Sequence, residues 1–395
     1  MLFSEPGALS IGAGVTLTTD DPSPTTSHYA VTSAAPLAGP FVSIGPGGSL
    51  SGFEIRDAAS SGAGVQTVCL AAADTASVSV STVRIVAASG GTPIVRFGSG
   101  VQVTGYCPVS MTNVTVDGAA TGILVESAPL VESTATAAHV TGSTVVGVSV
   151  LEGKISFTGG LLDLNAEGVS IGATGAGAPS FSAIGTTFSG NTGDAIYVGR
   201  GTLFSDGCPF VNNGTHVHAQ PVGGAAVNVT VQNSIGAAKM SGATNSAFRL
   251  LAMGSGSTVV LTNNAITGND TFQSYNVSTG LRRGGGLVLT APFPGTSSFH
   301  GNGFYGNKWD QVLVAASAPD ILDFSGGSSC GQASNSFACY DPLNPSVGLF
   351  SNGASVDAAW NQWTRQPGVF SIDVAGAGVS GYDTSACSPS TITCP

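Results

Sequence analysis

The chain has 395 residues, with 11 Lys and Arg against 22 Asp and Glu, and a formal net charge of −11 at pH 7. This acidic balance argues against a nucleic-acid-binding protein, because binding to phosphates depends on clustered Lys and Arg. Hydrophobic residues make up 42% of the chain and charged residues only 8%, whereas a disordered chain combines low hydrophobicity with high charge. We therefore expect the chain to fold.

Two further classes of segment are absent from the sequence. It contains no run of about eighteen apolar residues that would cross a bilayer, so we expect no membrane insertion. Its first residues, Met1 to Pro6, do not have the basic and then apolar pattern of a secretory signal. A signal segment is therefore not expected within this chain.

Short apolar runs bounded by turn residues begin near the N-terminus. The first spans 10–17 and ends before Asp20-Asp21-Pro22, and others follow at 41–44, 53–55, 65–68, 78–86 and 94–97. Each run is too short for a helix core and has the length of a strand. Gly accounts for 57 residues, which would make long helices costly. The sequence therefore predicts an all-β protein.

A short phrase, one small residue followed by two alternating aliphatic residues, recurs through the middle of the chain. It starts at Gly122, Gly147 and Gly168, and in looser form at Ala195 and His216. Successive copies are 21 to 27 residues apart. A sustained period in the twenties is typical of a repeat protein in which each repeat packs on the next.

The same ladder continues towards the C-terminus, with a second phrase at its turns. The aliphatic pairs are Phe248 and Leu250, Leu287 and Leu289, Val312 and Val314, and Val347 and Leu349. In the second phrase an apolar residue is followed two or three positions later by Asn, as at Asn191, Asn213, Asn269 and Asn307. Asn suits repeated sharp corners, because it tolerates left-handed backbone and can hydrogen-bond to neighbours in a stack.

The seven cysteines lack the CxxC spacing of a zinc or redox site, so disulfides are expected. Cys69 with Cys107 would join neighbouring repeats, and Cys330 with Cys339 and Cys387 with Cys394 would close short C-terminal loops. Cys208 is then left over. Disulfides form in oxidising compartments, so we expect a secreted or cell-surface protein.

The periodicity, the Asn corners and the phrase from Val356 to Trp363 together resemble the right-handed parallel β-helix superfamily, which has the pectate-lyase-like fold and includes bacterial surface repeat proteins. The resemblance covers about residues 9–372. It implies a single solenoid of about 12 coils over residues 1–372. Residues 373–395 would form a C-terminal tail or cap that is stapled by disulfides.

Alternation along the strands selects candidate functional residues. If the aliphatic pairs point inwards, the residue between each pair points outwards. Those residues are Tyr197, His218 and Arg249 on three successive coils, where they would form a column. His216 would share this exposed face, and Asp194 would lie at the turn before it.

This column predicts a carbohydrate-binding strip formed by Tyr197, His216, His218 and Arg249. Tyr offers a flat face to a sugar ring, Arg can pair with a carboxylate, and His can bind or transfer a proton. The same residues would also support β-elimination on a uronate, with His218 as base, Tyr197 as acid and Arg249 neutralising the carboxylate. The alternative is that these are ordinary polar residues on the outside of a sheet.

Other chemistry has weaker support. Polygalacturonase-like members of the superfamily carry Asn-Thr-Asp, Asp-Asp, Gly-His-Gly and Arg-Ile-Lys motifs, and this chain has only Asn191-Thr192-Gly193-Asp194. Hydrolysis needs two carboxylates held several ångströms apart, for which Asp163 with Asp194 and Asp194 with Asp206 are candidate pairs. Pectate-lyase-like members bind Ca²⁺, and calcium is possible at the coil ends, where Glu126, Glu132, Glu152 and Glu167 recur. No other metal or cofactor is expected.

Ser- and Thr-rich stretches such as Ser77 to Ser81 suggest an ice-binding face. Such a face requires the same residue type at the same position on successive coils, and the sequence alone does not align Thr in this way.

From the sequence as a whole, we expect a secreted or cell-surface protein with a structural or adhesive role that contacts glycans or another cell-surface component. The alternatives are a polysaccharide lyase or glycoside hydrolase and a subunit that self-assembles into extracellular filaments.

Overall fold

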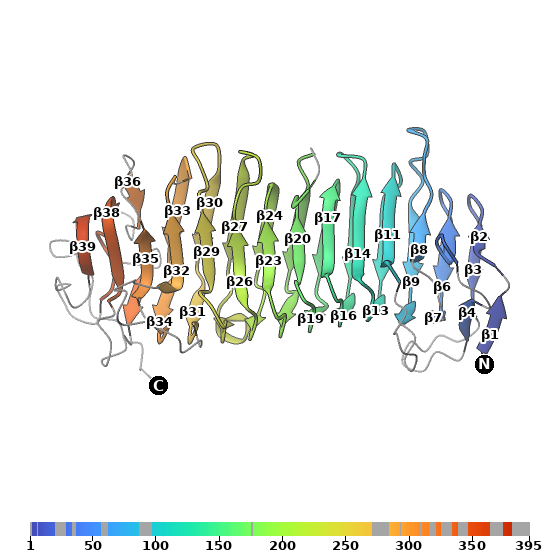
Figure 1. The fold of residues 1–395 in the computed structure, drawn as a ribbon, viewed down its shortest axis with the longest axis horizontal. Coiled ribbons are helices and arrows are strands. Elements are labelled where there is room, and N and C mark those ends of the chain that lie inside the picture. Colours follow the sequence, from blue (N-terminus) through green and yellow to red (C-terminus); the bar gives the residue numbers. More distant parts are fainter. Residues whose placement is uncertain are drawn as a thin grey trace. The chain divides into compact units, whose positions relative to one another are not determined.

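The computed structural model describes residues 2–5, 7–19, 29–33, 37–56, 62–86, 97–174, 177–270, 284–292, 294–308, 310–315, 321–324, 334–338, 347–363 and 374–380. The chain divides into two compact units, Met1–Gly193 (unit 1) and Asp194–Pro395 (unit 2). In each unit, strands follow one another into three parallel sheets, here named A, B and C, so that three successive strands form one coil (Figure 1).

The strands of unit 1 are as follows. Sheet A contains β1 (Leu2–Glu5), β4 (Ala30–Ser33), β7 (Glu54–Arg56), β10 (Arg84–Val86), β13 (Thr115–Asp117), β16 (His139–Thr141), β19 (Leu161–Asp163) and β22 (Thr187–Ser189). Sheet B contains β2 (Leu9–Ile11), β5 (Val42–Ile44), β8 (Ala63–Thr67), β11 (Ser99–Gly105), β14 (Thr121–Ser127), β17 (Val146–Glu152) and β20 (Val169–Ile171). Sheet C contains β3 (Thr16–Thr18), β6 (Ser49–Ser51), β9 (Val78–Ser81), β12 (Val109–Thr112), β15 (Glu132–Thr136), β18 (Lys154–Thr158) and β21 (Ser180–Ile184).

Unit 2 repeats this order of sheets. Sheet A contains β25 (Phe210–Val211), β28 (Met240–Ser241), β31 (Ala265–Thr267), β34 (Gly303–Tyr305) and β37 (Ser336–Ala338). Sheet B contains β23 (Asp194–Val198), β26 (Thr215–Ala219), β29 (Phe248–Leu251), β32 (Gly284–Thr290), β35 (Asp310–Ala315) and β38 (Leu349–Asp357), and both β36 (Ile321–Asp323) and β39 (Val374–Ser380) pair with β38. Sheet C contains β24 (Gly201–Asp206), β27 (Val227–Gln232), β30 (Thr258–Thr262) and β33 (Thr296–His300).

The prediction of an all-β solenoid built from parallel strands is confirmed. Among the described residues the only helical segment is one 3₁₀ turn, η1 (Gly236–Ala238), and no helix there is long and apolar enough to cross a membrane. Two predicted strands are wrong in their extent. Residues 10–17 contain the end of β2, a corner and the start of β3. Residues 78–86 form β9 and β10 with a corner at Thr82, where φ is 55°.

The core of each unit is a stack of inward side chains from all three sheets. In unit 1, Phe157 and Phe181 have ring centroids 5.4 Å apart, and both are fully buried. In unit 2, Phe304, Phe337 and Trp363 stack in sequence, with centroid separations of 5.4 and 4.6 Å. Each coil therefore covers the apolar side chains of the next, as expected of a solenoid.

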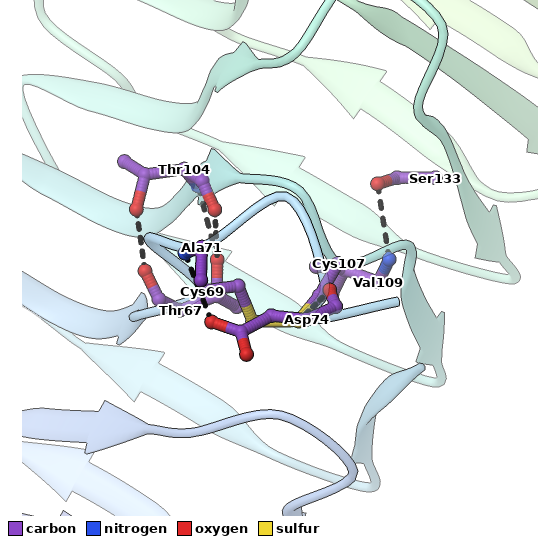
Figure 2. Close-up of a disulfide and its surroundings, with 8 residues drawn as sticks. All are labelled: Thr67, Cys69, Ala71, Asp74, Thr104, Cys107, Val109 and Ser133. Atoms are coloured by element: carbon purple, nitrogen blue, oxygen red, sulfur yellow. Dashed lines mark hydrogen bonds between the residues drawn. A yellow bond between two sulfur atoms is a disulfide. The ribbon is translucent and has the colours of Figure 1, made fainter. Parts of the chain in front are cut away.

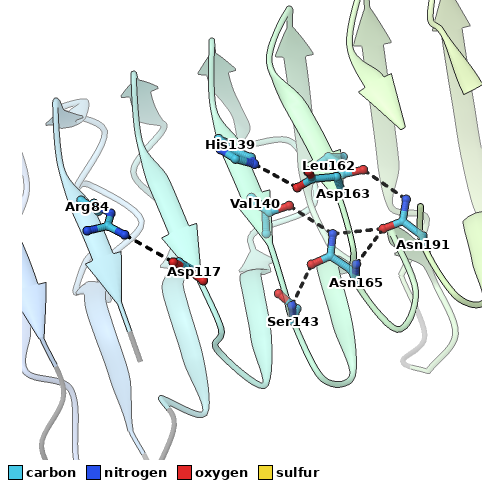
Figure 3. Close-up of polar contacts among 9 residues, drawn as sticks. All are labelled: Arg84, Asp117, His139, Val140, Ser143, Leu162, Asp163, Asn165 and Asn191. Atoms are coloured by element: carbon cyan, nitrogen blue, oxygen red, sulfur yellow. Dashed lines mark hydrogen bonds and ion pairs between the residues drawn. The ribbon is translucent and has the colours of Figure 1, made fainter. Parts of the chain in front are cut away.

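The corners contain buried Asn ladders. In unit 1, Asn191 Oδ1 accepts hydrogen bonds from the backbone N and Nδ2 of Asn165, both at 3.1 Å (Figure 3). In unit 2, Asn269 and Asn307 are joined in the same way. The predicted stacking of corner Asn residues is confirmed, but positive φ falls on the residue before the buried Asn, as at Gly190 and Gly268.

The first residue of the recurring phrase is small because it is buried at the start of a sheet B strand. A Cβ atom added to Gly122 would lie 2.2 Å from Val140 Cγ1 and 2.4 Å from the carbonyl oxygen of Gly147. Such contacts are far below van der Waals distance, so only glycine fits at this position. The phrase thus marks where each coil turns into sheet B.

The predicted disulfide between Cys69 and Cys107 is present, with a sequence separation of 38 residues (Figure 2). It joins the coil that contains β8 to the coil that contains β11, and beside it the backbone N of Thr104 donates to Thr67 Oγ1 at 3.0 Å. Cys208 is buried. The predicted pairs Cys330–Cys339 and Cys387–Cys394 lie outside the described residues.

Candidate functional site

The outward column predicted from the sequence is present on sheet B of unit 2. Tyr197 pairs with His218 in the β23–β26 ladder, and His218 pairs with Arg249 in the β26–β29 ladder. The residues on either side of them, such as Val217 and Phe248, are fully buried. Burial of these aliphatic and aromatic neighbours fixes the alternation and turns the three polar side chains outwards.

The column continues beyond Arg249 as three apolar residues. Val288, Leu313 and Phe350 occupy the same register position on β32, β35 and β38. The outward column of unit 2 therefore changes from polar to apolar along its length. In the sequence, Val288 and Leu313 lie between the aliphatic pairs Leu287 and Leu289 and Val312 and Val314, so the same alternation extends the column beyond Arg249.

His218 is held by a carboxylate. Its Nδ1 lies 2.7 Å from Asp194 Oδ2, and the side chains are only 13% and 22% exposed. Its ring meets the Tyr197 ring edge to face, with centroids 5.3 Å apart. Tyr197 in turn donates from its hydroxyl to the carbonyl oxygen of Gln220 at 3.4 Å. Asp194, predicted at the turn before the column, is thus in direct contact with it.

The other ring nitrogen of His218 is enclosed by the protein. Nε2 is buried and has no hydrogen-bond partner among the described residues. A carboxylate on Nδ1 favours the tautomer with its proton on that nitrogen, which leaves a lone pair on Nε2. This is the arrangement of a base and its orienting carboxylate.

A pocket lies beside Arg249. It has a volume of about 250 Å³ and is lined by Asn245, Ser246, Arg249, Asp270, Gly284, Val288 and Leu313. Within the described part of the chain, Arg249 makes no ion pair. It lines the pocket together with polar residues, which include the acidic Asp270, and with the apolar Val288 and Leu313. Pockets that combine apolar walls with a few polar groups are typical ligand sites.

The pocket wall contains an irregularity in the sheet. The β32–β35 register shifts between Gly284 and Leu287, and Ser246 Oγ donates to the Gly284 carbonyl oxygen. A Cβ atom added to Gly284 would lie 2.8 Å from Leu313 Cβ. Bulges of this kind occur often next to functional sites, because they redirect the chain.

The predicted exposure of His216 is wrong. Its side chain is fully buried, with Nδ1 3.3 Å from Asn213 Nδ2 and Nε2 3.0 Å from Asn269 Oδ1. Burial lowers the pKa of His216 from 6.5 to about 3, and the hydrogen bond to Asn269 opposes this shift only in part. Both ring nitrogens face the Asn ladder of the corner.

The cause lies at the start of β26. The backbone N of His216 and that of Val217 both donate to the carbonyl oxygen of Ala247, at 3.1 and 2.9 Å, so the alternation is broken before Val217. His216 occupies the first position of the recurring phrase, which is Gly or Ala in the other copies. That position is buried, and the phrase itself was the signal that could have placed His216 inside.

The other proposed acidic sites are not assembled in the described residues. Asp206 Oδ1 accepts from Asn233 Nδ2 on sheet C at 2.8 Å, whereas Asp194 contacts His218 on sheet B. Glu126 accepts from Gln102, and Glu132 accepts from Ser156. Within the described ranges no three His, Cys, Asp or Glu side chains group as metal ligands.

The fold and the site define a parallel β-helix-like solenoid with an aromatic, imidazole and guanidinium column on one sheet. No protein-family model matches the sequence, and no curated protein matches it either.

Proposed function

We propose that this chain is an extracellular or cell-surface protein with a structural or adhesive role, and that it binds glycans through the outward column of sheet B in unit 2. The fold would be a right-handed parallel β-helix of the pectate-lyase-like superfamily, with about 12 coils. Residues 373–395 would form the cap. The stacked parallel sheets and the Cys69–Cys107 disulfide, which requires an oxidising compartment, support this proposal.

The observation that carries the proposal is the position of Arg249. Its guanidinium has no ion-pair partner among the described residues, and it lies between His218 and the apolar residue Val288 on one sheet. A sugar ring has an apolar C–H face and a polar edge, so it matches a surface that combines Val288 and Tyr197 with Arg249. A carboxylate on the sugar would pair with the guanidinium in two parallel hydrogen bonds.

A binding panel tests this function. The full chain is applied to immobilised acidic and neutral polysaccharides, and its affinity is compared with that of Arg249→Ala. Loss of a charge-assisted hydrogen bond weakens binding by about tenfold or more. Lys239→Ala is the matched control, because it removes the same charge from an exposed position in unit 2 just before β28. Equal affinity of the Arg249→Ala variant and the parent would contradict the proposal.

A polysaccharide lyase is the second candidate, and the contact between Asp194 and His218 favours it. His218 Nε2 would remove the proton beside the carboxylate of a uronate, Arg249 would stabilise the resulting charge, and Tyr197 would protonate the leaving oxygen. Incubation with uronate polysaccharides, followed by absorbance of the unsaturated product, tests this activity. Product formation that is lost in His218→Gln supports a lyase, and binding without product would leave only the adhesive function.

A further inference from the structure

The outer face of sheet C in unit 1 carries two columns of hydroxyl side chains. The first column contains Ser or Thr on all seven strands, and the second on six strands, before it ends at Ile184. The first column is Thr16, Ser49, Ser79, Ser110, Thr134, Ser156 and Ser182. The second is Thr18, Ser51, Ser81, Thr112, Thr136 and Thr158. Every Thr in these columns is exposed, and every Ser is half-buried.

The columns remain in register because the same corner follows them on successive coils. The residue after the second column has positive φ on five successive strands and after Ile184, at Gly52, Thr82, Asn113, Ala137, Gly159 and Gly185. A fixed corner fixes which residues face outwards. The described pairings of sheet C in unit 1 show no register shift, whereas sheet B shifts between Val125 and Glu126.

The result is a two-dimensional grid of hydroxyl groups. Neighbouring strands in a sheet are ~4.8 Å apart, and residues two positions apart on a strand are separated by ~6.7 Å. Ser81 Oγ donates to Ser51 Oγ at 3.0 Å, which shows that hydroxyls of adjacent coils lie close enough to share a hydrogen-bond network. Each hydroxyl can both donate and accept. The Thr side chains are stiff at χ1, which holds their oxygens in place.

The described ion pairs of unit 1 lie on sheet A. On sheet A, Arg84 Nη2 lies 3.4 Å from Asp117 Oδ2, and His139 Nε2 lies 2.9 Å from Asp163 Oδ1 (Figure 3). In the strands of sheet C the charged residues are Glu132 and Lys154. They face outwards beside the first column, and Ser156 Oγ donates to Glu132 Oε1 at 2.8 Å. The two columns themselves therefore contain no charged residue, although one carboxylate contacts the first column at its edge.

Sheet C of unit 2 has no such grid. Its outward positions include Phe204, Asp206, Val260 and His300 among the hydroxyl and amide side chains. A parallel sheet in this protein thus does not by itself produce two hydroxyl columns. The regular grid of unit 1 is a property of the residues at those positions.

We propose that this grid binds ice. Ice presents a flat and periodic array of water oxygens, and a rigid array of uncharged hydroxyls with a repeat of similar size can hold water in the same order. A crystalline polysaccharide is the other periodic surface to consider, but sugar rings pack on aromatic faces, and the two columns contain none. The sequence alone did not reveal the grid, because its members are separated by 22 to 33 residues.

The test uses the full chain and two substitutions in one coil. Ice recrystallisation and partition of the protein into a slowly growing ice surface are measured for the parent, Thr136→Lys and Thr141→Lys. Both residues are on sheet surfaces of the same coil, but Thr136 lies in the grid on β15 and Thr141 lies on β16 of sheet A. Thr134→Lys serves as a second grid variant, and thermal unfolding checks that each variant folds.

We expect the parent to inhibit recrystallisation and to partition into ice, both grid variants to lose at least tenfold of this activity, and Thr141→Lys to retain it. Absence of ice activity in the parent would overturn the proposal. Equal loss in Thr141→Lys and the grid variants would do so as well. Pull-down on crystalline cellulose and chitin is measured in parallel, and binding there without ice activity would assign the grid to a polysaccharide surface instead.

Discussion

His218 Nδ1 lies 2.7 Å from Asp194 Oδ2, a contact that joins neighbouring strands of sheet B in unit 2. Asp194 begins β23, and its carboxylate reaches the outward side chain of the next coil. The contact orients the imidazole beside Tyr197 and directs Nε2 away from the carboxylate. In the sequence, His218 is one polar residue among others. In the structure, its contact with Asp194 fixes its orientation.

Removal of this carboxylate is expected to release His218. In Asp194→Ala, nitrogen NMR should show the imidazole changing from the Nδ1–H tautomer to a mixture, because the acceptor on Nδ1 is gone. Glycan affinity should fall about fivefold, as expected for loss of one hydrogen bond. Asp206→Ala, which removes an acid from sheet C, is the control. An unchanged His218 tautomer in Asp194→Ala would show that the contact does not orient the ring.

The free energy of unfolding is expected to decrease as the pH is lowered, because His216 is buried in the folded chain. Its pKa is about 3 in the folded chain and 6.5 in the unfolded chain, so between these values only the unfolded chain binds a proton on this residue. The contribution is fully present above pH 6.5 and is lost as pH falls towards 3, by up to about 1.4 kcal/mol per pH unit. Urea unfolding of the parent and His216→Gln between pH 7 and pH 4 measures this slope. Identical slopes would exclude the mechanism.

The Asn ladder of unit 2 is expected to contribute strongly to stability. Asn269 Oδ1 accepts from the backbone N of Ala243 at 3.0 Å and contacts His216, and its Nδ2 donates to Asn307 at 2.8 Å. Asn269→Ala leaves these buried groups without partners, which should cost about 3 kcal/mol or more. Asn228→Ala, at a half-buried outward position, should cost less than about 1 kcal/mol. Similar losses in urea unfolding would contradict this assignment.

The Cys69–Cys107 disulfide in unit 1 should stabilise the folded chain, because it closes a loop in the unfolded chain. Cys69 and Cys107 are 38 residues apart, and closure of a loop of this length lowers the entropy of the unfolded chain by an amount equivalent to about 3–4 kcal/mol. The double variant Cys69→Ala/Cys107→Ala should lose this stability in urea unfolding. A reducing agent should destabilise the parent more than it destabilises the double variant. Equal sensitivity of both proteins to reduction would assign the effect to other cysteines.

Much of the fold was readable from the sequence because one physical rule repeats on each coil. The pairs around Tyr197, His218 and Arg249 are aliphatic or aromatic, so period-two alternation identified both the core and the outward column. The pairing of Cys69 with Cys107 followed from their positions on neighbouring coils. One predicted pairing is wrong by two residues. The sequence aligns Val312 with Val347, but in the structure Val312 pairs with Leu349. A shift by two residues preserves the inward face, so the assignment of Leu349 to the core was still correct.

The remaining features depend on corners and loops of variable length. His216 is buried because two backbone amides share one carbonyl at its corner, and alternation alone does not reveal such a break. The pocket beside Arg249 brings Ser246, Gly284 and Leu313 together from different coils. The hydroxyl grid requires the register of each coil, which the differing loop lengths conceal. Periodicity locates strands, but the corners decide which side chains meet.

The structure of a complex with a glycan tests the central claim most directly. Crystals of the full chain soaked with an oligosaccharide of uronic acids should show a sugar carboxylate paired with the Arg249 guanidinium and a sugar ring against Val288 and Leu313. Crystals of Arg249→Ala treated in the same way should show no sugar at this position. A sugar bound elsewhere while the Arg249 pocket contains only water would contradict the account.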